Sequence, residues 1–182
     1  MKKRCKFLSL IPALLLWAMF SVLLWGSVFV RITDAPRENK ITLYADAQVQ
    51  DGTALSVALE DVKADGIRMV QARPFSFAMF DGGPLEQADL LIVPASHADT
   101  YREWLGPLPE EIAALGDCLT RDGAPWGLKI YDASTHAGAA AGFIAYEETE
   151  TPEDYYLFFG VHSVHIEDGK AVLYAKKLLE LQ

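Results

Sequence analysis

The chain has 182 residues, with 16 Lys plus Arg against 25 Asp plus Glu, and a formal net charge of −9 at pH 7. Phosphate contacts need clustered Lys and Arg, so this excess of acid argues against nucleic-acid binding. The length is sufficient for one domain to bury a full hydrophobic core without disulfides.

The amino-terminal segment contains the longest uncharged run of the chain. Residues 7–30 carry no charge and follow four cations, Lys2, Lys3, Arg4 and Lys6. At about 1.5 Å per residue, a helix of this length reaches about 36 Å, enough to cross a hydrocarbon core of about 30 Å. The sequence therefore predicts a transmembrane helix over residues 7–30.

A cleaved secretory signal peptide is the alternative interpretation of this segment. Signal peptides usually have about 7–15 apolar residues followed by small residues at a cleavage site. This run is longer and ends in Val28, Phe29, Val30 and Arg31, so we expect an uncleaved anchor in the lipid bilayer. The positive-inside rule places the basic tail in the cytoplasm and residues 31–182 outside the membrane.

Cysteine and asparagine usage indicates the compartment. The two cysteines, Cys5 and Cys118, lie on opposite sides of the predicted membrane helix and cannot pair within one chain. The only asparagine, Asn39, is followed by Lys-Ile and offers no glycosylation sequon. These features favour a single-pass protein of a bacterial plasma membrane, with an acidic extracytoplasmic domain.

Predicted strands and helices alternate after a polar stalk at residues 31–40. Apolar residues at i, i+4 and i+7 from Leu55 predict a helix, with Thr53 as its cap. Ser96 is a predicted cap for a short helix through Trp104. The predicted strands of this half are residues 41–45, 67–72 and 88–95, the last apolar enough to be buried on both faces.

The second half of the chain adds a hairpin, further strands and a closing helix. Residues 118–132 predict a β-hairpin around an Asp-Gly turn, and residues 135–142 a flexible glycine-rich loop. Both faces of the run at 155–161 are apolar, which predicts a central buried strand, and another strand is expected at 143–147. Together with a helix from Gly169 or Lys170 to Leu181, these elements predict a single mixed, mostly parallel α/β domain over residues 41–182.

Several segments, in their order along the chain, resemble a known family. They are ITLYADA from residue 41, DGIRMVQA from 65, ADLLIVPAS from 88, TRDGAPWGLKIYD from 120, and EDYYLFFGVHSVH with AVLYAKKLLEL near the end. This series resembles the first lobe of bacterial extracellular solute-binding proteins, the receptors of ABC importers. The resemblance implies one lobe of a periplasmic-binding-protein fold and a transport-associated role.

The family usually has two lobes that close over a ligand, whereas the resemblance here covers one. We therefore expect a truncated, membrane-anchored relative that binds without catalysis. Its expected partner is a small solute, such as a sugar, peptide or amino acid, or an envelope or transporter protein.

Polar residues follow the predicted strands where a ligand would bind. In open parallel sheets, ligands lie beyond the carboxyl ends of the strands. The candidate ligand-binding residues are Asp46, Arg73, Ser96, His97, Tyr131 and Asp132. The alternative is that these residues only cap helices and solvate loops.

No motif in the sequence points to a metal, a cofactor or a catalytic nucleophile. Cys-x-x-Cys, His-Glu-x-x-His and Gly-x-Ser-x-Gly patterns are absent, so we expect no metal and no cofactor. Two alternatives to the binding hypothesis stay open. One is an envelope hydrolase using His97 with Asp132 or Ser96, and the other is a decayed receptor without a ligand.

Overall fold

A computed structural model describes residues 11–75, 83, 85–146 and 152–181, with only the backbone of residues 27–33. The chain divides into two units, residues 1–36 and residues 37–182, and each is described by itself. The predicted cytoplasmic tail, including Lys2, Lys3, Arg4 and Lys6, lies outside the described residues.

The first unit contains one long helix, α2 (Ile11–Thr33). This confirms a helix in the apolar segment, although residues 7–10 of the prediction lie outside the described part. Apolar side chains such as Leu16, Trp17 and Phe20 are exposed along it. Over the residues that the structure covers, no helix is both long and apolar enough to cross a membrane, so the transmembrane assignment is not confirmed.

The second unit begins directly after residue 36. Of the predicted stalk, residues 31–33 belong to α2, Arg37–Asn39 form the short 3₁₀ helix η1, and Lys40 already lies in the first strand. The connection between α2 and η1 is therefore residues 34–36.

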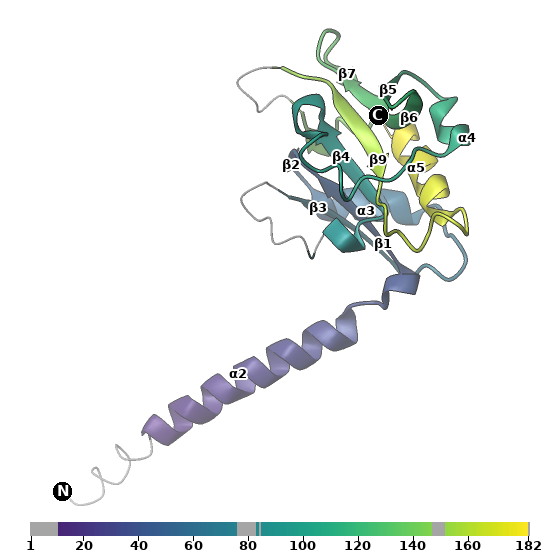
Figure 1. Cartoon of the computed structure of the whole chain (residues 1–182). Coiled ribbons are helices and arrows are strands. Elements are labelled where there is room, and N and C mark those ends of the chain that lie inside the picture. Colours follow the sequence, from purple (N-terminus) through teal and green to yellow (C-terminus); the bar gives the residue numbers. More distant parts are fainter. Residues whose placement is uncertain (1–10, 76–82, 84, 147–151, 182) are drawn as a thin grey trace, which may run out of the picture. The chain divides into compact units, whose positions relative to one another are not determined.

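The second unit is an α/β domain built on a mixed seven-strand sheet (Figure 1). Its strands are β1 (Lys40–Ala45), β3 (Met69–Pro74), β4 (Leu90–Pro94), β5 (Cys118–Arg121), β6 (Ala124–Asp132), β7 (Ala137–Gly138) and β9 (Tyr155–Phe159). The order is β3-β1-β4-β9-β6-β5, and β7 also pairs with β6. A separate two-strand sheet joins β2 (Gln48–Val49) to β8 (Ile144–Ala145).

Strand direction corrects one prediction. β1 is parallel to both β3 and β4, whereas β9 is antiparallel to β4 and β6, and β6 is antiparallel to β5 and β7. The description of the sheet as mostly parallel is therefore wrong. The reason is that β9 inserts in the opposite direction between β4 and β6, and the β5–β6 hairpin is antiparallel by construction.

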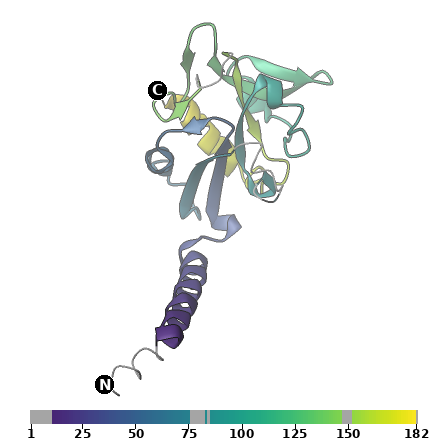
Figure 2. The same cartoon turned by 90° about the vertical axis from the view of Figure 1, so that its left-hand side faces the viewer.

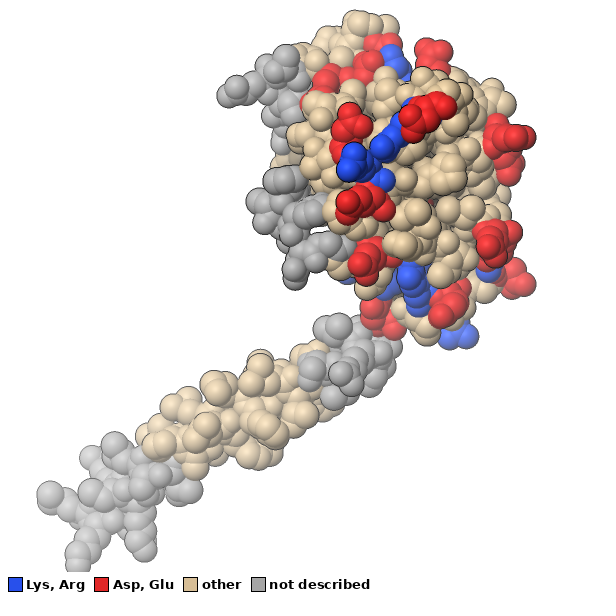
Figure 3. Space-filling view, viewed as in Figure 1, with Lys and Arg blue, Asp and Glu red and all other residues tan. Residues whose placement is uncertain are grey.

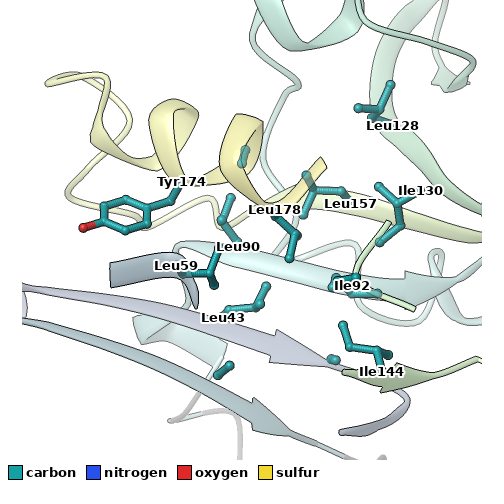
Figure 4. Close-up of a cluster of buried hydrophobic side chains, with 14 of the residues drawn as sticks. Leu43, Leu59, Leu90, Ile92, Leu128, Ile130, Ile144, Leu157, Tyr174 and Leu178 are labelled. Carbon is teal, nitrogen blue, oxygen red and sulfur yellow. The ribbon is translucent and has the colours of Figure 1, made fainter. Parts of the chain in front are cut away.

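Helices cover one face of the sheet. They are α3 (Gly52–Glu60), α4 (Glu110–Ala113) and α5 (Lys170–Glu180), and Figure 2 shows α5, in yellow, lying along the sheet. Leu59 of α3 and Leu178 of α5 point toward the strands (Figure 4). This face holds the larger hydrophobic core.

The opposite face carries a second core, so the central strands are buried on both sides. In β4, Leu90 and Ile92 belong to the first core, whereas Leu91 and Val93 belong to the second. This alternation is the period-2 pattern of a strand. The second core is completed by η3 (Leu85–Gln87) and by the segment after β4, which begins with η4 (Ala95–His97). The predictions of buried central strands at 88–95 and 155–161 are confirmed.

Local capping differs from the prediction at two places. The side chain of Asp51, and not that of Thr53, caps α3 by accepting the N–H of Ala54 at 2.8 Å. Pro94 precedes η4, so Ser96 caps no helix there. The Asp122-Gly123 turn of the hairpin is confirmed, with φ of 50° and 81°, both in the left-handed region that this two-residue turn requires.

Candidate functional site

The topology gathers polar residues at one end of the sheet. β1, β3 and β4 end there, and β9 begins there because Tyr155 is the partner of Pro94 in β4 and of Tyr131 in β6. We call this end the carboxyl edge and define it by Asp46, Ser96, His97, Tyr131, Asp132 and Glu153–Tyr155. The opposite end, where the chain enters at Lys40, is called the amino edge and includes Asp89 and Gly160–His165.

Asp46 and His97 form the closest polar pair of the carboxyl edge. Nδ1 of His97 lies 2.6 Å from Oδ2 of Asp46, and the hydroxyl of Tyr101 donates to the same oxygen at 3.2 Å. The Asp46 side chain is only 12% exposed, whereas that of His97 is 49% exposed. Asp46 is therefore held from two sides, and it orients an imidazole that solvent can reach.

The two hydrogen bonds to Asp46 also define the proton positions. Burial, together with the charge and hydrogen bond of Asp46, raises the pKa of Tyr101, so its hydroxyl remains a donor. A carboxylate accepts hydrogen bonds, so Nδ1 of His97 carries the proton that faces Asp46. In a neutral imidazole, Nε2 is then the acceptor.

Ser96 contributes through its backbone. Its N–H donates to Oε2 of Glu153 at 3.1 Å, and the N–H of Ala95 donates to the carbonyl of Asp154 at 3.0 Å. These bonds attach the segment before β9 to the end of β4. The carboxylate of Glu153 is thereby bonded to Ser96, the residue that precedes His97 in the chain.

Tyrosines form the other half of the carboxyl edge. Tyr131 stacks on Tyr146 with ring centroids 4.6 Å apart, and Tyr155 contacts both rings at 6.1 and 5.0 Å. Burial and the charges of Glu153 and Asp46 raise the pKa of Tyr155 to about 12. Tyr155 thus lies between the acidic residues and the tyrosine pair.

A pocket opens beside these tyrosines. It has a volume of about 350 Å³, and its lining includes Gln50, Tyr131, His136 and Tyr146. Tyr146 donates its hydroxyl to the carbonyl of Ala139 at 2.7 Å, which fixes that ring. The lining of the pocket includes neither Asp46 nor His97, so the pocket and the pair are two separate features of this end of the sheet.

Asp132 lies at the carboxyl edge, but its side chain is hydrogen-bonded within the turn that follows β6. Its Oδ1 accepts hydrogen bonds from the backbone and hydroxyl of Ser134 and from the N–H of Thr135. The hydrogen bonds from Ser134 lower the pKa of Asp132. Its other oxygen is 3.7 Å from Nζ of Lys129, which lies 2.6 Å from Asp154. Asp132 thus helps to hold the edge together.

Arg73 is placed apart from the other predicted residues. It is exposed near the end of β3, opposite Tyr44 in the register with β1. Among the described residues, no hydrogen bond or ion pair joins Arg73 to Asp46, His97 or the tyrosines. The structure therefore brings together Asp46, Ser96 and His97. It places Tyr131 with Tyr146 and Tyr155, keeps Asp132 in its turn, and leaves Arg73 on the neighbouring strand.

Sequence reasoning missed Tyr101, His136, Tyr146, Glu153 and Tyr155 as neighbours of the site. Tyr101 follows His97 by four residues, a spacing that could have indicated a shared face. His136 belongs to the predicted flexible loop at residues 135–142, and Glu153 belongs to no predicted element. Glu153 and His136 reach this end of the sheet because β9 and β7 both pair with β6. No local sequence pattern predicts that pairing.

The amino edge carries a separate buried polar network. Asp89 is 1% exposed, and it accepts the N–H of Thr42 at 2.9 Å and the hydroxyl of Ser163 at 2.6 Å. His165, 2% exposed, places Nε2 at 3.1 Å from the carbonyl of Arg37 and 3.2 Å from that of Lys40. These bonds attach the entering chain to the sheet, which is a structural role.

Charge is mixed over the surface of the second unit. Acidic side chains are spread over the face in Figure 3, with basic side chains among them. Within the described ranges, no group of three or more His, Cys, Asp or Glu residues could hold a metal ion.

Comparison of the chain with protein-family models, curated proteins and solved structures finds no match.

Proposed function

We propose that the chain is a membrane-anchored, extracytoplasmic binding domain that takes up a small solute at its carboxyl edge without catalysis. The observation that carries this proposal is the Asp46–His97 hydrogen bond, which joins the ends of two adjacent parallel strands and leaves the imidazole half exposed. Strand ends of this kind are where open α/β sheets receive ligands.

The exposure of His97 supports a binding role over a purely structural one. A histidine that only stabilises the fold is expected to be enclosed, as His165 is. His97 is oriented by Asp46 and yet remains half exposed. An oriented polar group open to solvent is available to a ligand.

The proposed anchor rests on the sequence of residues 7–30. Their uncharged run follows four cations and is long enough for a bilayer. The described part of α2 exposes apolar side chains around the helix, which favours an apolar surrounding. An envelope or transporter protein at the carboxyl edge is the alternative partner.

The hydrolase alternative rested on His97 acting with Asp132 or Ser96. His97 is paired with Asp46 instead, Asp132 is held in its turn, and Ser96 bonds to Glu153 through its backbone. The described contacts of His97 include no hydroxyl that Nε2 could deprotonate. A general base must lie within hydrogen-bond reach of the proton that it removes, so the arrangement supports binding better than hydrolysis.

A thermal-shift screen of the full chain in detergent micelles tests solute binding. Sugars, peptides and amino acids are added singly, and a bound solute raises the melting temperature because it stabilises the folded state. His97→Gln should abolish the rise, whereas His162→Gln, an exposed histidine at the amino edge, should leave it unchanged. A rise that survives His97→Gln contradicts the proposed site.

Cysteine labelling tests the anchor and its orientation. In a chain with Cys5→Ser and Cys118→Ser, the exposed Leu115 is replaced by cysteine and intact cells are treated with a membrane-impermeant maleimide. The proposal predicts labelling in intact cells and retention of the chain in carbonate-washed membranes. Recovery in the supernatant would contradict the anchor, and labelling only after lysis would contradict the orientation.

A further inference from the structure

His165, at the amino edge, is a buried histidine whose two ring nitrogens both face oxygen atoms. Nε2 lies 3.1 Å from the carbonyl oxygen of Arg37 and 3.2 Å from that of Lys40, where the second unit begins. Nδ1 lies 3.4 Å from Oδ2 of Asp168, and the His165 side chain is only 2% exposed. An oxygen acceptor needs an N–H opposite it, and an imidazole carries an N–H on both nitrogens only when it is protonated. The surroundings of His165 therefore suit an imidazolium ion.

Two carboxylates supply negative charge around His165. Burial raises the pKa of Asp89, and its hydrogen bonds together with the charges of His165 and Arg37 partly oppose this rise. Burial also acts to raise the pKa of Asp168, but the hydrogen bonds from Lys170 and His165 outweigh it and lower that pKa. Nearby negative charge favours the charged form of an imidazole and offsets the cost of burying it.

The basic residues on the adjoining elements leave this arrangement intact. Arg37 and Lys40 present their backbone carbonyls to His165. Lys170 places Nζ 2.7 Å from Oδ2 of Asp168, the same oxygen that faces Nδ1 of His165. Asp168 is therefore shared between a lysine and the histidine.

Loss of one proton from His165 affects the two sides of the ring differently. Nε2 faces two backbone carbonyls, which cannot turn away, so the neutral ring is expected to keep its proton there. Nδ1 then turns a lone pair toward Asp168, and a carboxylate cannot donate to it. The Asp168 side chain is 38% exposed, so it can turn to solvent. Deprotonation is therefore expected to break the Asp168 contact and to leave the chain entry attached.

Asp168 also holds the first turn of α5. Its Oδ1 accepts the N–H of Lys170 at 3.1 Å, and the carbonyl of His165 accepts the N–H of Ala171 at 2.9 Å. Gly169, which precedes the helix, has φ of 72° and offers no side-chain cap. The first amides of a helix need such acceptors, so a released Asp168 leaves the start of α5 less well held.

We propose that His165 is a proton-dependent latch between the entry of the chain into the sheet and the first turn of α5. The imidazolium donates on both sides and holds the turn, whereas the neutral ring releases Asp168. The latch is therefore closed at low pH and opens as pH rises through the titration of His165. Histidine is the side chain that ordinarily changes its charge between about pH 5 and 8. This device goes beyond the proposed binding function and does not depend on it.

NMR of the isotope-labelled full chain in nanodiscs tests the latch. The imidazole ¹⁵N signals of His165 are followed from about pH 5.5 to about pH 8.5. Solvent exchange of the Lys170 and Ala171 amides is measured over the same range and divided by the intrinsic rate at each pH. The matched control is the amide of Ala54, which donates to a capping carboxylate at the start of α3 at 2.8 Å.

The expected result joins the two readouts. Both nitrogens of His165 carry protons at the low end of the range, and Nδ1 loses its proton as pH rises. Across that titration, corrected exchange of the Lys170 and Ala171 amides should rise by at least about fivefold, which corresponds to one hydrogen bond of about 1 kcal/mol. The Ala54 amide should change by less than about twofold.

Three variants separate the latch from a general effect of pH. His165→Gln cannot titrate and should abolish the pH dependence at Lys170 and Ala171, whereas His162→Gln, an exposed histidine of the same segment, should retain it. Asp168→Asn removes the charge that faces Nδ1, so His165 should lose its proton at a lower pH.

Each of three outcomes overturns the inference. One is a His165 ring whose protonation does not change over the range, and another is a titration of His165 that leaves the Lys170 and Ala171 amides unaffected. The third is a pH dependence that survives His165→Gln. If His165→Gln does not fold, Asp168→Asn decides, because an unchanged titration of His165 in that variant would show that Asp168 does not hold the Nδ1 proton.

Discussion

His97 and Asp46 are 51 residues apart in the sequence, and their side chains hydrogen-bond at 2.6 Å. Asp46 follows β1 and His97 follows β4, two parallel neighbours in the sheet. The pair is therefore a product of topology, since parallel strands bring their carboxyl ends to one edge. The account of the molecule as a binding domain depends on this contact.

Replacing Asp46 should change the tautomer of His97. In Asp46→Ala, the acceptor for Nδ1 is lost, so the neutral ring should return to the mixture of tautomers found in free histidine. Imidazole ¹⁵N shifts of the full chain measure this directly. His165 serves as an internal control because its Nε2 faces two carbonyl oxygens at the other edge. An unchanged His97 spectrum would show that Asp46 does not orient the ring.

Gly160 is predicted to be intolerant of any side chain. A Cβ at this position would lie 1.9 Å from the carbonyl oxygen of Ala88, which is backbone and cannot move aside cheaply. Gly160→Ala should therefore lower the free energy of unfolding by about 3 kcal/mol, measured by urea denaturation. Gly116→Ala is the control, because its Cβ would come no closer than 3.4 Å to Leu128, and it should cost under about 1 kcal/mol. Equal losses in both variants would contradict the close approach at Gly160.

Ser56 provides a hydrogen-bond acceptor for the outer edge of β3, the terminal strand of the sheet. Its hydroxyl donates to the carbonyl of Gly52 at 2.7 Å and accepts the N–H of Ala72 at 3.0 Å. Ser56→Ala leaves that N–H without its partner and should lower the free energy of unfolding by about 1 kcal/mol. Ser96→Ala, an exposed serine whose described bond is through the backbone, should change it by less than about 0.5 kcal/mol. A neutral Ser56→Ala would mean that water replaces the bond at this edge.

Asp89 should make stability fall as pH rises. Burial raises the pKa of Asp89 above 3.8, and the hydrogen bonds from Ser163 and Thr42 only partly oppose this. Because the folded-state pKa is the higher one, the contribution of Asp89 is fully present below pH 3.8 and is lost as pH rises through the folded-state pKa. Asp89→Asn keeps the shape and removes the titration. The stability of the unmodified chain relative to Asp89→Asn should therefore decrease from pH 3.5 upward.

The control for this pH profile is the exposed Asp99. The difference in unfolding free energy between the unmodified chain and Asp99→Asn should be nearly flat over the same range. If the Asp89→Asn difference instead increased with pH, the ionised carboxylate would be stabilising, and the assigned effect of burial would be wrong.

Patterns along the chain predicted most elements of the fold but not all of their directions. β1, β4, β9 and the β5–β6 hairpin follow from apolar runs and an Asp-Gly turn, and α5 follows from its helical spacing. An apolar run carries no information on strand direction, so the antiparallel insertion of β9 was not predictable. The helix cap was misassigned because Asp51 and Thr53 are both good caps, and only the backbone geometry selects Asp51.

The same limit applies to the candidate site. Asp46 and His97 were predictable because the strand-end rule needs only the positions of two parallel strands. Glu153 reaches the site through hydrogen bonds of the segment that leads into β9, and that placement depends on the pairing of β9 with β4 and β6. Arg73 satisfies the strand-end rule equally well, yet its side chain is not joined to the pair.

The four histidines allow the most direct test of the central claim that the carboxyl edge is the binding site. His97 lies at the carboxyl edge and His136 lines the separate pocket, whereas His162 and His165 lie at the amino edge. Imidazole ¹⁵N spectra of the full chain are recorded with and without a solute that raises its melting temperature. The account predicts that the signal of His97 moves and that those of His162 and His165 do not. Movement of His162 or His165 with His97 unchanged would contradict it.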